Sequence, residues 1–199
     1  MIVTMLNEKG GVGKSTIADE IFSSFERTGV SVALINTDAQ YGDAVRGDAS
    51  SAEVVIVDTP GTLPDNVDEM VAASDLIVVP TRPTARNVEP TCRVLTRVHD
   101  VDPYTPVLVV LVGTTTRGVA GARFATWLKD WLKGEGYEGH VSMCGIPHSE
   151  AFGAAEMAGV SVIELVRSNS SRYAREVGPS LTALVNHVRE LGGYEREEL

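Results

Sequence analysis

The sequence predicts an α/β fold in which a mostly parallel central sheet carries helices on both faces. Two observations lead to this prediction. Short, nearly continuous apolar segments alternate with amphipathic segments along the chain, as expected for strands that are buried on both sides by crossover helices. A glycine-rich loop also separates the first apolar segment from a helical pattern, which is the order of a strand–loop–helix unit in such a fold.

The first half of the chain contains four expected strands and one clear helix. The helix runs from Ser15 to about Arg27, with apolar residues on one face and Gly29 behind it to end it. Residues 39–52 are polar and glycine-containing, so we expect a loop there. The expected strands are residues 2–6, Val30 to Ile35, Val54 to Val57, and Leu76 to Val79, the last ended by Pro80.

The second half continues the alternation. We expect Phe124, Trp127, Leu128 and Trp131 to form the packing face of their helix. The expected strands are Val107 to Val112 and Val141 to Cys144, and the expected helices are about 87–100, 119–133, 149–158 and 171–191. Ligands of such sheets bind beyond the carboxyl ends of the strands, so we look for a site there.

The loop from Asn7 to Thr16, with the sequence NEKGGVGKST, carries the most specific chemistry in the chain. Its three glycines allow the backbone to turn so that successive amide groups point inward and bind an anion. Lys14 can reach the β- and γ-phosphates of a nucleotide, and the Ser15 hydroxyl can bind Mg²⁺. The strict pattern has glycine where this chain has Glu8, and a second lysine, Lys9, stands at the front of the glycines.

This loop resembles the deviant Walker A box of the ParA/MinD superfamily of P-loop ATPases. The resemblance implies that Lys9 reaches across a nucleotide-sandwich homodimer to the phosphates of the partner subunit, so that turnover depends on dimerisation. It implies ATP and Mg²⁺ as cofactors, and slow ATP hydrolysis without a partner protein. The implied nucleotide-binding residues of the loop are Lys9, Gly10, Gly11, Val12, Gly13, Lys14, Ser15 and Thr16.

Two carboxylates follow expected strands. Apolar residues lead into Asp58, as in a Walker B strand, and Asp58 can hold a metal-bound water. Asp38 matches the second aspartate of the family's Asp-x-Asp-Pro-Gln segment, which implies that it positions the attacking water. Here Asn36 replaces the first aspartate and Ala39 replaces the proline. We expect these departures to bear on the rate of hydrolysis more than on nucleotide binding. Either carboxylate could instead cap a turn.

The loops after the last two expected strands are expected to frame the adenine. By the resemblance, Thr115 and Pro147 contribute to this part of the site. His148 follows directly, and we expect it to be a surface or stacking residue rather than a catalytic base.

Composition excludes several classes of protein. No apolar run reaches the length of a membrane span, and no signal peptide is recognisable, so we expect a cytoplasmic protein without membrane contact. Cys92 and Cys144 have no metal-ligand spacing and are expected to be buried thiols. We expect one domain over residues 1–199, with an acidic, frayed tail at 191–199 and no DNA-binding domain ahead of the loop.

Within the superfamily, the chain is most similar to small ParA-type partition ATPases. That resemblance implies non-specific DNA binding and a small ParB-type centromere-binding partner, and with DNA binding a location on the nucleoid. The net charge of −10 makes any DNA affinity modest and salt-dependent. An ATPase that positions a protein cargo without DNA is the alternative. The candidate DNA contacts, which could equally be solvated surface charges, are Arg117, Arg123, Lys129, Lys133, Arg167, Arg172 and Arg175.

Overall fold

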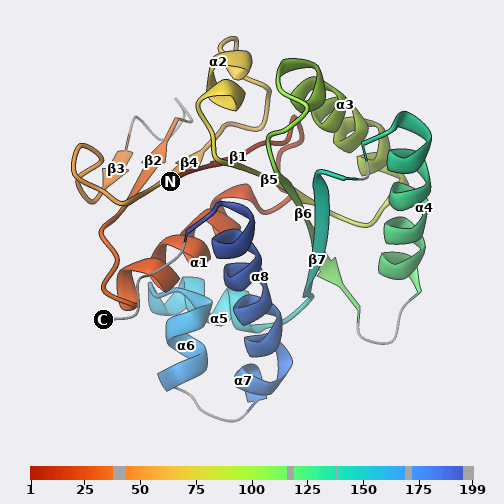
Figure 1. Cartoon of the computed structure of the whole chain (residues 1–199). Helices are drawn as coiled ribbons and strands as arrows, with labels where there is room; N and C mark the ends of the chain where they lie inside the picture. The colour runs from red at the N-terminus through yellow and green to blue at the C-terminus, as the bar shows by residue number, and fades with distance from the viewer. Residues whose placement is uncertain (38–43, 116–118, 138, 169–171, 195–199) are drawn as a thin grey trace.

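The protein folds around one seven-stranded sheet, shown in Figure 1. The computed structural model describes residues 1–37, 44–115, 119–137, 139–168 and 172–194. The strand order is β3-β2-β4-β1-β5-β6-β7, and every neighbouring pair is parallel except β2 and β3. The predicted α/β fold with a mostly parallel sheet is therefore confirmed. The strands are β1 (Ile2–Met5), β2 (Val32–Asn36), β3 (Ala44–Arg46), β4 (Val54–Asp58), β5 (Leu76–Thr81), β6 (Val107–Thr114) and β7 (Val141–Pro147).

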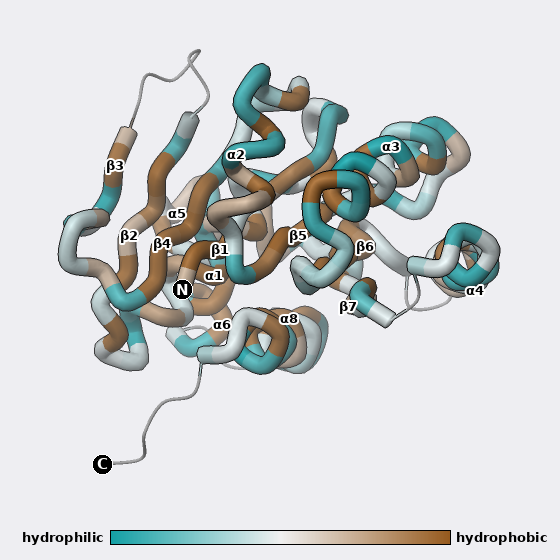
Figure 2. The backbone as a smooth tube through the Cα atoms, turned by 45° about the horizontal axis from the view of Figure 1, so that its top comes forward, coloured by the Kyte–Doolittle hydropathy of each residue, from teal (hydrophilic) through white to brown (hydrophobic). Residues whose placement is uncertain are grey.

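Helices cover both faces of the sheet, as predicted, and each face has its own apolar core (Figures 1 and 2). On one face, α1, α5, α6 and α8 pack against side chains such as Met5, Ile56 and Val110. On the other face, α2, α3 and α4 cover Leu6, Ile77 and Val109. The helices are α1 (Lys14–Arg27), α2 (Val67–Ala72), α3 (Ala85–Val101), α4 (Ala120–Glu135), α5 (Ala151–Ala158), α6 (Val162–Ser168), α7 (Arg172–Glu176) and α8 (Gly178–Leu191).

The sheet differs from the sequence-based expectation at two places. The predicted loop at 39–52 contains β3, whose three exposed residues pair antiparallel with β2, from Leu34↔Arg46 to Asn36↔Ala44. Pro80 does not end its strand but lies inside β5. Proline is tolerated there because β1 pairs with β5 only as far as Val78, so Pro80 needs no N–H for that neighbour.

The helices also differ from the expectation. The structure adds α2 and α6, which were not predicted, and divides the helix expected at 171–191 into α7 and α8. The buried stripe of α4 is Phe124, Leu128 and Leu132, whereas Trp127 is 39% exposed. A spacing of four residues places one narrow stripe against the sheet and leaves Trp127 on the flank of that stripe.

The carboxyl end of the chain packs more closely than predicted. Residues 195–199 of the expected frayed tail lie outside the described residues, but the ring of Tyr194 contacts Phe25 edge to face, with 5.4 Å between ring centroids. Within the described part of the chain, no helix is long and apolar enough to cross a membrane.

Candidate functional site

The loop between β1 and α1 has a backbone that only glycine adopts easily. Gly11 and Gly13 have φ angles of 71° and 103°, in the left-handed region that disfavours a side chain. Asn7, which is 1% exposed, fixes the start of the loop. Its side-chain amide donates to the Pro80 carbonyl at 2.8 Å, and its side-chain oxygen accepts from the Lys9 N–H at 3.0 Å.

The two lysines of the loop lie in different environments. Lys14 is only 7% exposed, and its Nζ donates to the carbonyl oxygens of Asn7 at 3.1 Å and Lys9 at 3.3 Å. Its ammonium group is therefore held inside the loop. The side chain of Lys9 is exposed. One lysine thus belongs to the interior of the loop, and the other faces outward beside Gly10.

The amino end of α1 completes the loop. The Ile17 N–H donates to the Gly13 carbonyl at 2.9 Å and begins the helical hydrogen bonding. Among the described residues, no side chain caps this end, and the first turn contains no acidic residue. The amide groups and dipole of this helix end are therefore available to an anion. Ser15 and Thr16 are both exposed in this first turn.

Asp58 ends β4 beside the loop. It pairs in register with Met5 of β1 and Asn36 of β2, and it is 4% exposed. The next residue, Thr59, is tied to β1 through a 2.6 Å hydrogen bond from its hydroxyl to the Met5 carbonyl. Two residues after Thr59, Gly61 lies so close to the loop that an added Cβ would come 3.2 Å from Gly10 Cα.

Ser15 in the first turn of α1 provides a hydroxyl, and Asp58 at the end of β4 provides a carboxylate. Such oxygen ligands suit Mg²⁺. In the described ranges, no group of three or more His, Cys, Asp or Glu residues could hold a metal on its own. A metal here therefore fits a ligand set completed by nucleotide oxygens and water. Asp38, predicted to position the water, lies outside the described residues.

A cavity of about 560 Å³ adjoins the loop. Its lining includes Gly13 and Thr16 of the loop. It extends to Thr115, the residue that follows β6 in the chain, and to Pro147 at the end of β7. The structure therefore brings the two predicted adenine-loop residues to the same cavity. The sequence did not predict that Arg82, the residue that follows β5, and Phe152 of α5 would line this cavity. Their only signal in the sequence was that both follow expected strands of the sheet.

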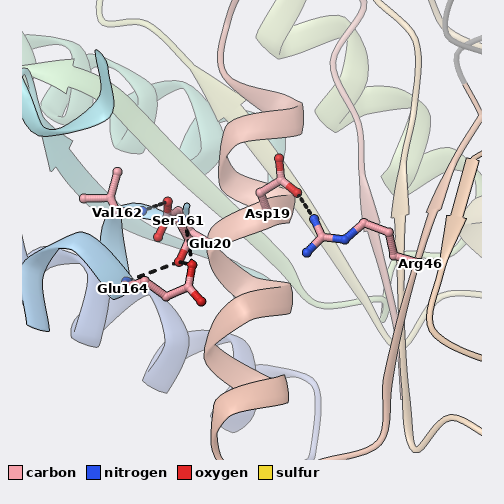
Figure 3. Close-up of polar contacts among 6 residues, drawn as sticks. All are labelled: Asp19, Glu20, Arg46, Ser161, Val162 and Glu164. Carbon is pink, nitrogen blue, oxygen red and sulfur yellow. Dashed lines mark hydrogen bonds and ion pairs between the residues drawn. The ribbon is translucent and has the colours of Figure 1, made fainter. Parts of the chain in front are cut away.

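A second cavity, of about 470 Å³, lies between α1 and the α5–α6 turn and shares Thr16, Phe152 and Gly153 with the first. Figure 3 shows the contacts along it. Glu20 of α1 is 2% exposed and accepts hydrogen bonds from the N–H groups of Val162 at 2.6 Å and Ile163 at 3.0 Å. Burial raises the pKa of this carboxyl group, although these two bonds act in the opposite direction. Glu20 therefore joins the helix of the phosphate loop to α6.

Neighbouring contacts strengthen this junction. Ser161 and Glu164 form a capping box at the start of α6, in which the Ser161 N–H donates to Glu164 at 2.8 Å and the Glu164 N–H donates to the Ser161 hydroxyl at 3.2 Å. On the other side of α1, Arg46 of β3 donates to Asp19 at 2.7 Å. Figure 3 shows that Glu20 ties α1 to the start of α6 and that Asp19 ties α1 to Arg46 of β3.

The predicted DNA-contacting residues do not share one surface. Arg123, Lys129 and Lys133 lie on α4, on one side of the sheet, whereas Arg167, Arg172 and Arg175 lie on α6 and α7, on the other side (Figure 1). All six are exposed, and Arg172 lies 3.4 Å from Glu150. Arg117 lies outside the described residues. The candidates therefore form two separate groups, which the sequence could not reveal.

Both cysteines are partly buried free thiols. Burial raises the pKa of Cys92 to about 11 and that of Cys144 to about 12. Both thiols therefore stay protonated at neutral pH and are poor nucleophiles.

Comparison with known proteins identifies the family. A family model described as the CobQ/CobB/MinD/ParA nucleotide binding domain matches residues 3–193. The chain belongs to this family. It is a nucleotide-binding ATPase of the ParA/MinD type, and the resemblance seen in the loop is confirmed.

Solved structures share the fold at low sequence identity. The cell division protein MinD from Aquifex aeolicus has a TM-score of 0.70 and 14% identity, covering 100% of this chain and 99% of that one. The pnob8 ParA has a TM-score of 0.70 and 12% identity, covering 95% and 98%. MinD from Pyrococcus horikoshii, in complex with Mg-ADP, has a TM-score of 0.69 and 13% identity, covering 99% of both chains. A search of curated proteins gave no match.

Proposed function

We propose that this ATPase is a ParA-like partition protein. In this proposal it binds Mg-ATP, forms a nucleotide-sandwich dimer and holds non-specific DNA. It hydrolyses ATP when a ParB-type centromere-binding partner stimulates it, and so segregates a plasmid or prophage. The observation that carries the proposal is the contrast between the two loop lysines, since Lys14 is buried within its own loop and Lys9 is exposed beside Gly10. An outward-facing lysine at this place is available to a second subunit.

Within one subunit, each part of the site has a distinct task in this proposal. The loop amides and Lys14 bind the β- and γ-phosphates, and Ser15 with Asp58 holds Mg²⁺, Asp58 through water. The metal offsets the negative charge of the phosphates when it is bound. Asp38 positions the attacking water. Thr115 and Pro147, together with Phe152, form the walls around the base.

The role of Lys9 depends on dimerisation. Charge develops on the γ-phosphate oxygens during phosphoryl transfer, and a cation arriving from a second subunit stabilises it only after the dimer has formed. Hydrolysis is thereby coupled to assembly.

The Lys9→Ala variant tests this coupling. We expect it to bind ATP with nearly wild-type affinity, because Lys14 remains, but to stay monomeric and to lose stimulated turnover. Light scattering with ATP, ADP and no nucleotide measures the mass, and phosphate release measures turnover. An ATP-dependent dimer of Lys9→Ala that hydrolyses at the wild-type rate would contradict the proposed role.

A second candidate function, the positioning of a protein cargo without DNA, is favoured by one specific feature. The chain carries a net charge of −10, and the six described DNA-contact candidates are divided between the two sides of the sheet. DNA binding depends on a basic patch that releases counterions. Retention on DNA with ATP and with ADP, at low and moderate salt, separates the two functions, since only the partition function predicts ATP-dependent retention that salt weakens.

A further inference from the structure

Glu8, the residue that replaces a glycine of the strict phosphate-loop pattern, is held by a cation from another helix. Arg93 of α3 donates from Nε to Glu8 Oε1 at 2.6 Å, and its Nη2 forms an ion pair with the same oxygen. Arg93 also contacts Glu89, one turn earlier in α3. Eighty-five positions separate Glu8 from Arg93 in the sequence, so the contact exists only because of the fold.

The place of Glu8 in the loop makes this contact relevant to nucleotide binding. Glu8 lies between Asn7 and Lys9, the two residues whose carbonyl oxygens accept hydrogen bonds from Lys14. A carboxylate at this point repels the negative charges of a bound triphosphate. It also attracts Lys9, the neighbouring lysine that we assign to the partner's phosphates. An arginine paired with Glu8 offsets both effects.

We infer that Arg93 is a positioning residue for the nucleotide. It acts through Glu8, whose negative charge it neutralises at the front of the phosphate loop. The inference rests on the proposed binding of ATP at this loop. It links the affinity for ATP to α3, a helix that does not line the cavity of about 560 Å³ beside the loop. The side chain of Arg93 is 51% exposed, so the pair by itself contributes little to stability. Its effect is expected in the binding of anions instead.

The test uses a double-mutant cycle with a matched control. Removing Arg93 restores one uncompensated negative charge near the phosphates, so Arg93→Ala is expected to weaken Mg-ATP binding about tenfold at low salt. Because ADP carries one negative charge fewer than ATP, the affinity for Mg-ADP is expected to fall by less. Since ions screen charges over about 8–10 Å at physiological ionic strength, the loss should shrink as salt is raised. Glu8→Gln in the same chain is expected to restore the affinity.

Arg97→Ala is the control. Arg97 lies one turn further along α3, is 49% exposed, and forms an ion pair of 2.6 Å with Asp68 of α2, away from the loop. Calorimetry of the full chain with Mg-ATP and Mg-ADP gives the affinities, and thermal unfolding gives the stabilities. We expect Arg97→Ala to keep the wild-type affinity for both nucleotides.

The outcomes separate the possible explanations. Unchanged ATP affinity in Arg93→Ala would overturn the inference and make the contact a surface ion pair. A loss that persists in Arg93→Ala/Glu8→Gln would also overturn it, because Arg93 would then act on the nucleotide or the fold without Glu8. If the wild-type chain binds no nucleotide, the proposed function fails first. A selective, salt-dependent loss that Glu8→Gln reverses supports the inference.

Discussion

The phosphate loop and the wall of the adjoining cavity lie at the same edge of the sheet but are built in different ways. The loop is one continuous segment, from Asn7 to Thr16, and three hydrogen bonds join its own backbone to its own side chains. The cavity wall combines Arg82, Thr115, and Pro147 with Phe152, from three separate segments of the chain. The first region depends on local chemistry, and the second depends on how the elements pack.

This difference predicts how each region responds to substitution. We expect local damage to the loop to remove phosphate binding, because in the proposed function one ammonium group and a set of amides provide most of the interaction with the anion. A substitution in the cavity wall is expected to remove only one of several weaker contacts with the nucleotide. The following predictions test this contrast in order of decreasing effect.

The largest effect is expected for Lys14→Ala. The buried ammonium group is removed from the anion site, and truncating a desolvated charge contact costs about 2–5 kcal/mol. Binding of ATP and ADP should therefore weaken by about 100-fold or more, with little change in thermal stability. Calorimetric titration checks this. Lys129→Ala, which removes an exposed lysine of α4, should leave both affinities unchanged. If Lys14→Ala binds nucleotide almost as tightly as the wild type, the loop is not the phosphate-binding site.

A smaller effect is expected for Phe152→Ala. If the base occupies the cavity that Phe152 lines, loss of an aromatic contact with a base costs about 1–3 kcal/mol, so both ATP and ADP should bind about tenfold more weakly. Equal losses for the two nucleotides distinguish the wall from the charge-dependent loop. Met157→Ala serves as the control, since Met157 lies on the same helix and is 92% exposed. An unaltered affinity in Phe152→Ala would place the base elsewhere.

The smallest effect on nucleotide affinity is expected for substitution of Glu20, which joins α1 to the start of α6. Glu20→Ala leaves the N–H groups of Val162 and Ile163 without their acceptor, so we expect a loss of about 1–2 kcal/mol in the free energy of unfolding. The nucleotide affinity should change only a few-fold, because these bonds hold the start of α6 and not the phosphate loop. Chemical denaturation measures the stability, and nucleotide titration measures the affinity. A loss of affinity without a loss of stability would contradict the expectation that Glu20 acts mainly on the fold.

The same carboxylate gives a pH dependence with a definite sign. Burial raises the pKa of Glu20 in the folded state above its ordinary value of 4.5. The folded state therefore binds more protons than the unfolded state between these two pKa values, and the contribution of Glu20 to stability falls as the pH rises through that interval. Glu20→Gln lacks this titration, so its stability relative to the wild type should rise over the same interval. If the difference in the free energy of unfolding between Glu20→Gln and the wild type stays constant across the interval, the pKa of Glu20 is not raised.

Much of the fold could be predicted because its strands and helices carry their patterns locally. The apolar segments at Val54 to Val57 and Leu76 to Val79 match β4 and β5 closely. β5 is buried along its whole length, and β4 alternates between buried and partly buried residues, so neither strand has a polar face. The pattern failed where the packing decided the outcome. The strand β3 consists of three exposed residues and is formed only because β2 offers a free edge, and Pro80 continues β5 only because β1 has already ended.

The sequence by itself determined the phosphate loop, because glycines at Gly11 and Gly13, the helix start and Lys14 act within one segment. It also determined the family, which that loop specifies. Only the tertiary structure decided which distant residues complete the site. Arg93 reaches Glu8, Glu20 holds α6, and Phe152 joins Thr115 at one cavity. These contacts connect residues far apart in the chain, and no local pattern encodes them, because they arise only when the helices pack on the sheet.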